Sequence, residues 1–533
     1  MTTGTGSPRG RQMHRRQFLK YSTALAAACS PLFAPLAAAA QLKALGDKKP
    51  FDYAWLKGRA RSLAAADYLA PSKITDASLK ALDFDTYNAI HFKPDHGLWA
   101  DESRLFQVRF FHPGYLFESP VQMYEVVDGQ AQQLAYDPAM FDYGKSGVDG
   151  RKLPRDLGFA GFKLLFHTDP QRDLAAFLGA SYFRAVGGEM QFGLSARALA
   201  VDTGLPRAEE FPQFTHFWFE RPARDSGQLT VHALMDSPSV AGAYRFVIAP
   251  GAVQVMDVDA ALYPRKAIER LGVAPLTSMY QTGENDRRKA YDWRPEIHDS
   301  DGLAMLSGSG EWIWRPLLNP EHLRFNSYAD QSPRGFGLMQ RDRNFENYQD
   351  DGVFYERRPS LWVEPKGDWG KGAVQLMELP TEDETFDNIV AFWNPAEPAR
   401  PGEERLFSYR LHWGAHAPVE PAAARVIATR TGLGGVVGQP RKYFSWRFAI
   451  DFAGGDLPML GRDVKVEPVI DSSGGEIELA SARPLHAVNG YRVMFDLKPK
   501  AGSREPINLR VFLRADGRAL SETWLYQWSP PGG

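Results

Sequence analysis

The chain is poor in cysteine, because Cys29 is the only one among its 533 residues. A single cysteine cannot form an internal disulfide, and it cannot supply a metal site that needs several thiolate ligands. A chain of this length can bury enough apolar surface to be stable without crosslinks. We therefore expect a fold held together by packing, and no motif in the sequence predicts a metal ion or a cofactor.

An excess of positive charge is also missing. The chain has 62 Lys and Arg against 64 Asp and Glu, which gives a formal net charge of -2. The first 40 positions hold five of the basic residues and no acidic residue, so the chain without them carries -7. Nucleic-acid-binding proteins need a positive surface. The charge balance thus argues against a nucleic-acid partner and favours a neutral substrate.

Long hydrophobic runs are lacking as well. Beyond the N-terminal region, no window contains the ~18 apolar residues that a helix needs to cross a bilayer. The Ala-rich stretch from 21 to 40 is only mildly apolar, and Pro31 and Pro35 argue against a spanning anchor. The residues before Cys29 fit a lipidation signal poorly. We expect no stable membrane insertion.

The N-terminus carries the pattern of an export signal. Residues 14–20 read His-Arg-Arg-Gln-Phe-Leu-Lys, and the following stretch ends in Ala38-Ala39-Ala40. Paired arginines before Phe and Leu resemble a twin-arginine signal, and three small residues in a row resemble a cleavage site. We predict that residues 1–40 are a twin-arginine signal peptide, cleaved near Ala40, and that the mature chain is periplasmic.

Alternation of apolar and polar residues with a period of two dominates the mature chain, for example in 106–110, 374–379 and 409–413. This period is typical of half-buried β-strands. Helical patterns are few and short, at about 56–69, 171–178 and 264–271. The sequence therefore predicts an all-β protein.

Residues 395–402, Pro-Ala-Glu-Pro-Ala-Arg-Pro-Gly, have the composition of a linker. Eight strand-like runs follow, from 405–415 to 519–527, and Asn489-Gly490 and Asp516-Gly517 are typical hairpin turns. Seven or eight short strands in such a segment are typical of an immunoglobulin-like sandwich. We predict an N-terminal β-sandwich over 41–394, a linker over 395–402 and an immunoglobulin-like domain over 403–533.

Tryptophan is unevenly distributed along the chain. Aromatic faces stack on the apolar faces of sugar rings, so an aromatic cleft with polar rims would suit a glycan, although a protein core uses the same rings. The segment that holds six of the 13 tryptophans is also rich in Arg, Asp, Glu and Asn, which favours a carbohydrate site. These six residues are Trp293, Trp312, Trp314, Trp362, Trp369 and Trp393.

The same segment contains two acidic loops, at 298–302 (His-Asp-Ser-Asp-Gly) and 381–388 (Thr-Glu-Asp-Glu-Thr-Phe-Asp-Asn). Glycoside hydrolysis needs two carboxyl groups, one protonated to donate to the leaving oxygen and one ionised. Two such loops from distant parts of a β domain could face each other across a groove. Acidic turns are also common as solvated loops, so spacing alone leaves both interpretations open.

Several long runs resemble one known family, the periplasmic glucan biosynthesis proteins of the G/D group, and the twin-arginine start resembles its D branch. The matching runs cover nearly the whole mature chain. They include 156–162 (Asp-Leu-Gly-Phe-Ala-Gly-Phe), 177–185, 191–197, 297–301, 358–365 (Arg-Pro-Ser-Leu-Trp-Val-Glu-Pro) and 428–432.

The resemblance implies a large galactose-mutarotase-like β-sandwich that processes the glucan, joined to a C-terminal immunoglobulin-like domain. It implies a β-1,2-glucan substrate, an anomer-inverting glycoside hydrolase or a related transferase, and no cofactor. The general acid falls on Asp387 and the general base on Asp299, one in each acidic loop. The further candidate binding residues are Glu384, Arg358, Tyr355, Trp362, Glu364, His298, Asp301 and Trp312.

Three activities fit these residues. The first is an inverting hydrolase that cleaves the β-1,2-glucan backbone. The second is an inverting transglycosylase, in which a sugar hydroxyl replaces water and sets the length of the glucan or closes a ring. The third is a non-catalytic glucan-binding protein that serves the membrane glucan synthase, and the presence of both Asp299 and Asp387 argues against it. The sequence predicts no particular oligomeric state.

Overall fold

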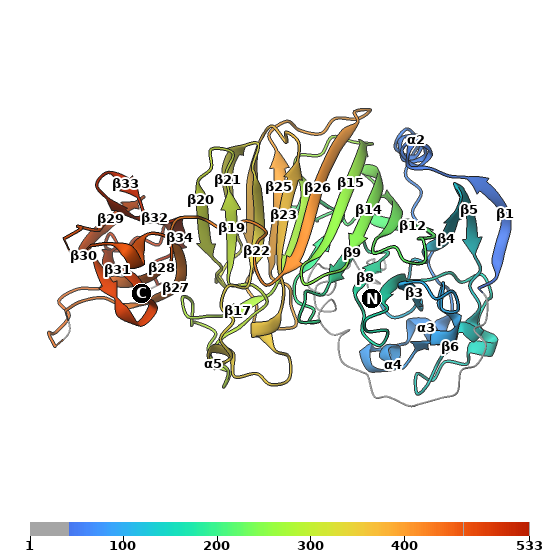
Figure 1. The fold of residues 1–533 in the computed structure, drawn as a ribbon, viewed down its shortest axis with the longest axis horizontal. Helices are drawn as coiled ribbons and strands as arrows, with labels where there is room; N and C mark the ends of the chain where they lie inside the picture. Colours follow the sequence, from blue (N-terminus) through green and yellow to red (C-terminus); the bar gives the residue numbers. More distant parts are fainter. Residues whose placement is uncertain (1–41, 437, 462, 532–533) are drawn as a thin grey trace, which may run out of the picture.

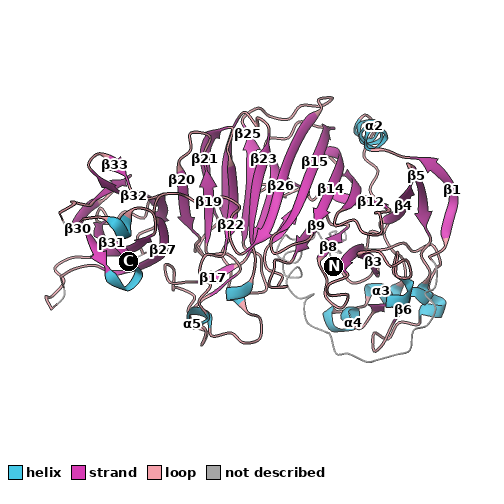
Figure 2. Ribbon diagram, in the orientation of Figure 1, coloured by secondary structure: helices cyan, strands magenta, loops and turns pink. Residues whose placement is uncertain are grey.

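The computed structural model describes residues 42–531 except for 437 and 462, so the predicted signal peptide lies outside the described residues. Within that range no helix is long and apolar enough to cross a membrane. Strands dominate and helices are short (Figures 1 and 2), which confirms the prediction of an all-β protein.

The largest element is a sheet of 16 strands that runs through most of the molecule. In spatial order its strands are β1 (Ala44–Pro50), β5 (Gln130–Leu134), β4 (Gln122–Val127), β12 (Gln213–Glu220), β13 (Leu229–Asp236), β14 (Val240–Ala249), β15 (Gln254–Pro264), β26 (Arg405–Gly414), β23 (Ser360–Lys366), β22 (Gly335–Met339), β19 (Gly302–Leu306), β20 (Trp312–Pro316), β34 (Thr523–Trp528), β32 (Ile507–Ala515) and β29 (Glu467–Ser472), with β33 (Arg518–Ala519) paired to β32.

A second sheet of ten strands packs against the first. In spatial order its strands are β21 (Arg324–Gln331), β24 (Lys371–Glu378), β25 (Ile389–Pro395), β16 (Leu271–Ser278), β10 (Ser195–Arg197), β9 (Tyr182–Ala185), β8 (Ala175–Leu178), β7 (Gly161–Phe166) and β3 (Phe106–Phe111), with β11 (Leu199–Val201) paired to β16.

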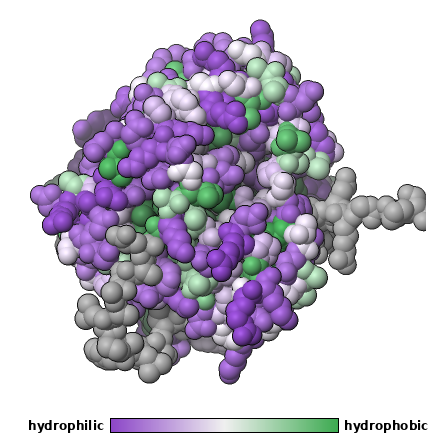
Figure 3. All heavy atoms as spheres, turned by 90° about the vertical axis from the view of Figure 1, so that its right-hand side faces the viewer, coloured by the Kyte–Doolittle hydropathy of each residue, from purple (hydrophilic) through white to green (hydrophobic). Residues whose placement is uncertain are grey.

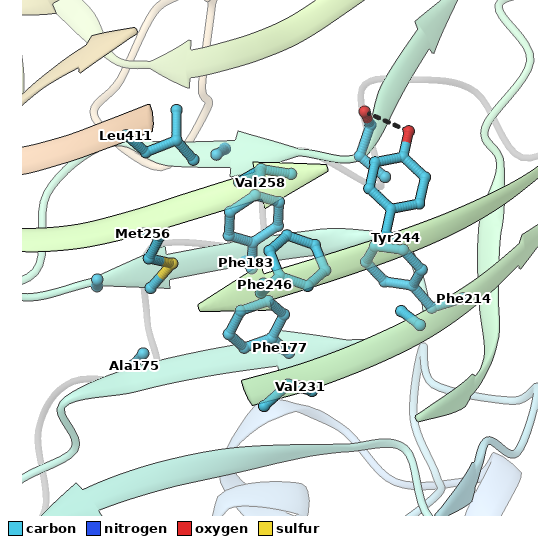
Figure 4. Packing of buried hydrophobic residues seen from close by; sticks show 14 of the residues in the cluster. Ala175, Phe177, Phe183, Phe214, Val231, Tyr244, Phe246, Met256, Val258 and Leu411 are labelled. Carbon is cyan, nitrogen blue, oxygen red and sulfur yellow. Dashed lines mark hydrogen bonds between the residues drawn. The ribbon is translucent and has the colours of Figure 1, made fainter. Parts of the chain in front are cut away.

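The two sheets enclose one apolar core, part of which Figure 4 shows. Phe177 and Phe183 of the second sheet stack with their ring centroids 5.0 Å apart, and the ring of Phe183 meets that of Phe246 of the first sheet edge-on at 5.3 Å. The hydroxyl of Tyr244 donates to the carbonyl of Ala198 at 2.9 Å, so the one polar atom on this ring is satisfied. Aromatic pairs of this kind add to the burial of area that holds the sheets together.

The predicted position of the C-terminal domain needs a correction. β25 ends at Pro395, but β26 (Arg405–Gly414) then lies between β15 and β23 in the middle of the large sheet. Tyr409, Leu411 and Trp413 belong to the main core. The prediction that the strand near 405–415 opens the C-terminal domain is therefore wrong. Prolines and glycine mark a turn between two strands of one sandwich as readily as a boundary between domains.

The chain leaves the sandwich after Gly414, and a smaller two-sheet unit follows. A four-stranded sheet of β27 (Arg425–Leu433), β28 (Trp446–Ala453), β31 (Gly490–Lys498) and β30 (Glu476–Leu485) shares a core with β29, β32 and β34. Because β34 pairs with β20 in parallel, this unit continues the large sheet. It lies at the left of Figure 1.

The short elements at the other end of the molecule come from the N-terminal part of the chain (Figure 1). They are α2 (Tyr53–Ala64), α3 (Ala77–Lys80), α4 (Phe84–Asn88), and the paired β2 (His91–Phe92) and β6 (Phe141–Asp142). The carboxylate of Asp52 caps α2 by accepting from the Trp55 N–H at 2.6 Å, and Leu56 and Ala60 pack against the large sheet. Figure 3 views this end, whose surface is mostly hydrophilic.

Of the three predicted helices, only the one near 56–69 forms, as α2. The segment 171–178 contains the strand β8, and 264–271 connects β15 to β16. Short apolar runs do not distinguish a helix from a buried strand, so tertiary packing decides between them.

Candidate functional site

The site is built where β16 ends. After Ser278 the chain passes Met279 and enters the short ribbon of β17 (Tyr280–Thr282) and β18 (Ile297–His298), below the lower edge of the sandwich in Figure 1. Asp299 follows β18 directly, and its N–H donates to the Met279 carbonyl at 2.9 Å. The hydroxyl of Ser278 also donates to that of Ser300, at 2.9 Å. These bonds fix the first acidic loop to the end of a core strand.

The second acidic loop is fixed to the neighbouring residue. Asn388 exchanges two hydrogen bonds with the backbone of Tyr280, accepting from its N–H at 2.8 Å and donating to its carbonyl at 2.9 Å. The next residue, Ile389, pairs with Ser278 where β25 and β16 begin their ladder. Asp299 and Asn388, the residue after Asp387, are therefore anchored to the consecutive residues 279 and 280, although 88 positions separate the two acids in the sequence.

Both carboxylates are withdrawn from bulk water. Asp299 is 0% exposed and Asp387 is 3% exposed. Asp299 accepts an ion-paired hydrogen bond from the Arg358 guanidinium through Oδ1. Within the described residues its other oxygen, Oδ2, is buried and has no hydrogen-bond partner. A buried carboxylate oxygen without a donor is costly, so this atom is a ready acceptor for a proton donor that enters the site.

Arg184, on β9, lies close to both acids. Burial lowers the pKa of this guanidinium to about 10, although the charges of Asp173, Asp387 and Asp299 act in the opposite direction. The guanidinium also lies over the ring of Phe192, 4.3 Å from its centroid. Phe386, the neighbour of Asp387, packs against Tyr182 of the same strand. β9 thus supplies the positive charge that the two acids share.

A chain of contacts leads from Asp299 to Glu384. The Arg358 guanidinium covers the ring of Tyr355, 4.1 Å from its centroid. The Tyr355 hydroxyl donates to Oε2 of Glu384, and burial raises the pKa of Tyr355 well above its usual value, so this group stays a donor. The same Glu384 oxygen accepts from Arg294 at 2.7 Å. Arg294 also donates to Asp350 at 2.8 Å, which makes it the hub of a charged cluster.

Asp299, Arg358 and Arg184 line a cavity of about 1090 Å³, whereas Asp387, Tyr355 and Glu384 are not among its lining residues. One wall is charged and includes Asp299, Arg358, Arg184 and Asp173. Eight aromatic residues from the N-terminal part of the chain and two later loops also line the cavity and form what we call its aromatic wall: Phe84, Tyr87, Phe92, Phe110, Phe111, Phe141, Phe192 and Phe354. Ligand sites for drug-sized molecules occupy roughly 300–1,000 Å³, so the cavity has room for several sugar rings. Among the described residues, no group of three or more His, Cys, Asp and Glu could hold a metal ion.

Of the predicted binding residues, Arg358 contacts Asp299, and Tyr355 and Glu384 follow it in the chain of contacts described above. His298 and Asp301 lie beside Asp299 in the chain but serve other contacts. His298 is hydrogen-bonded to Glu296 and Gln340, both at 2.9 Å. Burial alone would lower the pKa of His298, but the hydrogen bond and the charge of Glu296 have the larger effect, so its pKa is raised. Asp301 accepts from the backbone N–H groups of residues 341 and 342, and burial raises its pKa to about 6.

The structure does not bring Trp312, Trp362 or Glu364 to the cavity. Trp362 is 2% exposed and packs on Trp312, with the centroids 5.5 Å apart, in the core shared with the C-terminal unit. Glu364 is hydrogen-bonded to His412 at 2.8 Å on the neighbouring strand. Of the six clustered tryptophans, only Trp293 is largely exposed. A tryptophan count alone cannot distinguish a core from a cleft, and here the core takes most of these rings.

Two groups of site residues escaped the sequence analysis. Arg184 stands in a fully buried strand, Tyr-Phe-Arg-Ala, and a lone charge in such a strand is a signal that could have found it. Arg294 and Asp350 are ordinary loop residues, and most of the aromatic wall comes from segments far from Asp299 in the sequence. The farthest residue of the aromatic wall, Phe84, is 215 positions before Asp299, so no local pattern could have indicated these residues.

Comparison with known proteins identifies relatives of the whole chain. Residues 51–528 match the family described as "Periplasmic glucan biosynthesis protein, MdoG". A "Glucans biosynthesis protein D" from Xanthomonas campestris pv. campestris is 61% identical over 525 residues, which cover 97% of this chain and 98% of the relative. The protein of the same name from Stenotrophomonas maltophilia is 60% identical over 524 residues, with the same coverage of both chains. A solved structure of the Slr1438 protein from Synechocystis sp. PCC 6803 covers 57% of this chain and 98% of its own, at 7% identity. Its TM-score of 0.18 is too low to indicate a shared fold.

Proposed function

The chain belongs to the periplasmic glucan biosynthesis protein family, and from this premise we propose that it cleaves the backbone of a β-1,2-glucan as an anomer-inverting glycoside hydrolase. Asp387 is the general acid and Asp299 the general base. The observation that supports the proposal is the anchoring of the two acidic loops to consecutive residues, Met279 and Tyr280. Both acids are buried, Asp299 and the residue after Asp387 are hydrogen-bonded to residues 279 and 280, and Asp299 lines a cavity with one carboxylate oxygen unpartnered among the described residues.

The reaction assigns one role to each carboxyl group. Asp387 gives its proton to the glycosidic oxygen as the bond from the anomeric carbon to that oxygen breaks. A water molecule attacks the anomeric carbon from the opposite face, and its proton passes to Asp299, directly or through a relay. The proton lost by one acid and the proton gained by the other balance. The anomeric carbon is attacked once, so its configuration inverts.

The surrounding residues support this assignment. Arg358 holds one oxygen of Asp299 and leaves the other available, while Tyr355 and Glu384 continue the same network toward the second acidic loop. The aromatic wall offers faces on which sugar rings can stack, and the charged wall offers hydrogen-bonding groups for hydroxyls. A neutral polymer with apolar and polar faces suits such a lining.

The test is to incubate the purified mature protein with linear β-1,2-glucan and to follow the products by mass spectrometry and by proton NMR of the anomeric signal. Shortened oligomers that each carry one added water, released as the α-anomer, are the expected result. Asp387→Asn and Asp299→Asn should each lower the rate on the order of a hundredfold to ten-thousandfold. Asp257→Asn, which removes an ion pair with Arg410 on the large sheet, is the matched control and should retain the activity.

Other outcomes identify the two alternatives. Products that keep the mass of an anhydro chain would replace the hydrolase with a cyclising transglycosylase, in which a sugar hydroxyl takes the place of water. Linear products of altered length without an increase in the number of reducing ends would indicate a length-setting transglycosylase. A polymer that is bound but unchanged would indicate a glucan-binding protein that assists the membrane synthase. Activity that survives Asp387→Asn would refute the assignment of the acid.

We further propose that the protein works in the periplasm after export by the twin-arginine route. The Arg15-Arg16 pair and the family's periplasmic description support this location. Replacing both arginines with lysine should leave the protein in the cytoplasm, which fractionation detects. A periplasmic signal that persists in this variant would contradict the route.

A further inference from the structure

Two of the most exposed aromatic side chains in the described structure stand two positions apart in one loop. Tyr291 is 79% exposed and Trp293 is 70% exposed, in the segment 283–296 that joins β17 to β18. This loop ends at the ribbon that carries Asp299. Single exposed apolar residues are normal on a protein surface. Two neighbouring large rings beside a candidate active site need a reason, because their apolar faces remain in water.

The backbone under these rings is firmly held. Asp292 and Arg294 form a two-pronged pair, with Nε to Oδ1 at 3.0 Å and Nη2 to Oδ2 at 2.8 Å. The hydrogen bonds from Arg294 lower the pKa of Asp292 to about 2, so the pair stays charged at any physiological pH. Lys289 forms an ion pair with Glu382 of the second acidic loop. Side chains on a fixed backbone lose little conformational freedom when a ligand binds.

The same contacts join the loop to the cavity. Arg294 donates to Asp350 at 2.8 Å, and the other oxygen of Asp350 accepts from the N–H groups of Gly352 and Val353, both at 2.9 Å. Gly352 and Val353 line the cavity. Arg294 also donates to Glu384, which connects through Tyr355 and Arg358 to Asp299. The loop that carries the two rings is therefore connected through Arg294 to the cavity lining and to the contacts around Asp299.

We propose that Tyr291 and Trp293 form an outer sugar-binding platform for the part of the glucan chain that extends beyond the cavity. The inference rests on the proposed function, because the occupant is the same polymer. The flat rings would stack on the apolar C–H faces of pyranose units, and the paired charges around them would bind hydroxyl groups. The ion pairs Asp292–Arg294 and Lys289–Glu382 supply such hydrogen-bonding groups at this loop.

The platform makes the enzyme sensitive to chain length. A polymer long enough to reach both the cavity and the platform gains the stacking contact, whereas a short oligosaccharide that fills only the cavity does not. Tryptophan and tyrosine are enriched among the few residues that carry most of the affinity of a binding site, and a tenfold change in affinity corresponds to about 1.4 kcal/mol. Loss of the Trp293 ring should therefore weaken binding of the long polymer by about tenfold.

The experiment measures binding separately from turnover. Asp387→Asn serves as the background that binds without cleaving, and Trp293→Ala is added to it. The dissociation constants for long β-1,2-glucan and for a short oligosaccharide are measured by calorimetry. We expect about a tenfold rise for the polymer and a smaller rise for the oligosaccharide, with Trp293→Phe restoring most of the affinity. Trp55→Ala is the matched control, because Trp55 is 49% exposed on α2, at the opposite end of the molecule from the C-terminal unit.

The outcomes separate this inference from the proposed function. Equal polymer affinity in the Trp293→Ala and Trp55→Ala variants would overturn the platform, even if the enzyme cleaves the glucan. Wild-type protein that binds the polymer without cleaving it would overturn the hydrolase, and the platform would stand or fall on the Trp293→Ala affinity alone. A protein with no affinity for the polymer would overturn both. Thermal melting confirms that each variant is folded.

Discussion

Asn388 should control catalysis without touching the substrate. Its buried side chain makes three hydrogen bonds, one from the Tyr280 N–H at 2.8 Å, one to the Tyr280 carbonyl at 2.9 Å and one to the Leu379 carbonyl at 2.9 Å. Asn388→Ala removes all three and leaves buried backbone groups without partners. At about 0.5–1.5 kcal/mol for each bond, and more where a buried group stays unpaired, the loss of stability should be about 2–4 kcal/mol.

The loss of activity should be larger than the loss of stability explains. Asp387 precedes Asn388 directly, so the acid loses its anchor to the backbone next to the residue that holds Asp299. A shift of about 1 Å in a reacting group can lower a rate a hundredfold. We expect kcat on β-1,2-glucan to fall by about that factor at temperatures where the variant is fully folded, with KM changed much less.

The matched control is Asn394→Ala, at the other end of the same strand. Asn394 accepts from the Leu271 N–H at 2.9 Å, which secures the far end of the β16–β25 pair. Urea unfolding gives the stability of each variant, and initial rates below the unfolding transition give kcat. The control should lose stability and keep kcat. Equal losses of kcat in the two variants, or an unaltered kcat in Asn388→Ala, would refute the anchoring argument.

Two further predictions concern residues beside the site. Burial raises the pKa of Asp301 to about 6, against about 3.9 for an exposed Asp. The stability that protonated Asp301 contributes is therefore complete below about pH 4 and is lost as the pH rises through about 6. Urea unfolding of the wild type should lose about 3 kcal/mol across that range, and a loss of the same size in Asp301→Asn would contradict the assignment. Trp362→Ala should cost about 3–5 kcal/mol of stability while the folded variant keeps its kcat. A low kcat with normal stability would instead return Trp362 to the substrate site.

Part of the fold was accessible from local patterns, because those patterns reflect local physics. The alternation in 106–110 appears as β3, whose residues are buried and half-buried in turn. Asp516-Gly517 forms the predicted tight turn, with φ of 48° and 78°, between β32 and β33. Asn489 likewise adopts a positive φ, at 50°, just before β31. Turn residues and period-two strands carry their own conformational preference, and tertiary contacts did not override it here.

Long-range placement was not accessible in the same way. The strand at 405–415 has the same alternation as its neighbours, and only its pairing with β15 and β23 assigns it to the main sandwich. The tryptophan cluster failed for a related reason, since Trp362 and Trp393 are as suitable for a core as for a cleft. The two acidic loops could be chosen because the chemistry needs two carboxyl groups. Their meeting depends on the β16–β25 ladder, which no local pattern shows.

The position of the acids at the end of that ladder explains how one scaffold can hold a demanding geometry. A general acid and a general base must keep their separation while a flexible polymer passes between them, and a site on rigid strands holds such a distance better than free loops do. Here the loops supply the carboxylates, but each loop is anchored to a residue just after a core strand. Met279 accepts from the Asp299 N–H, and Tyr280 is hydrogen-bonded to Asn388, the residue after Asp387. Changes within the loops should therefore alter substrate preference more readily than they alter the spacing of the acids. Changes at Asn388 should do the reverse, which makes the comparison of these two classes of variant the most direct test of how the site is built.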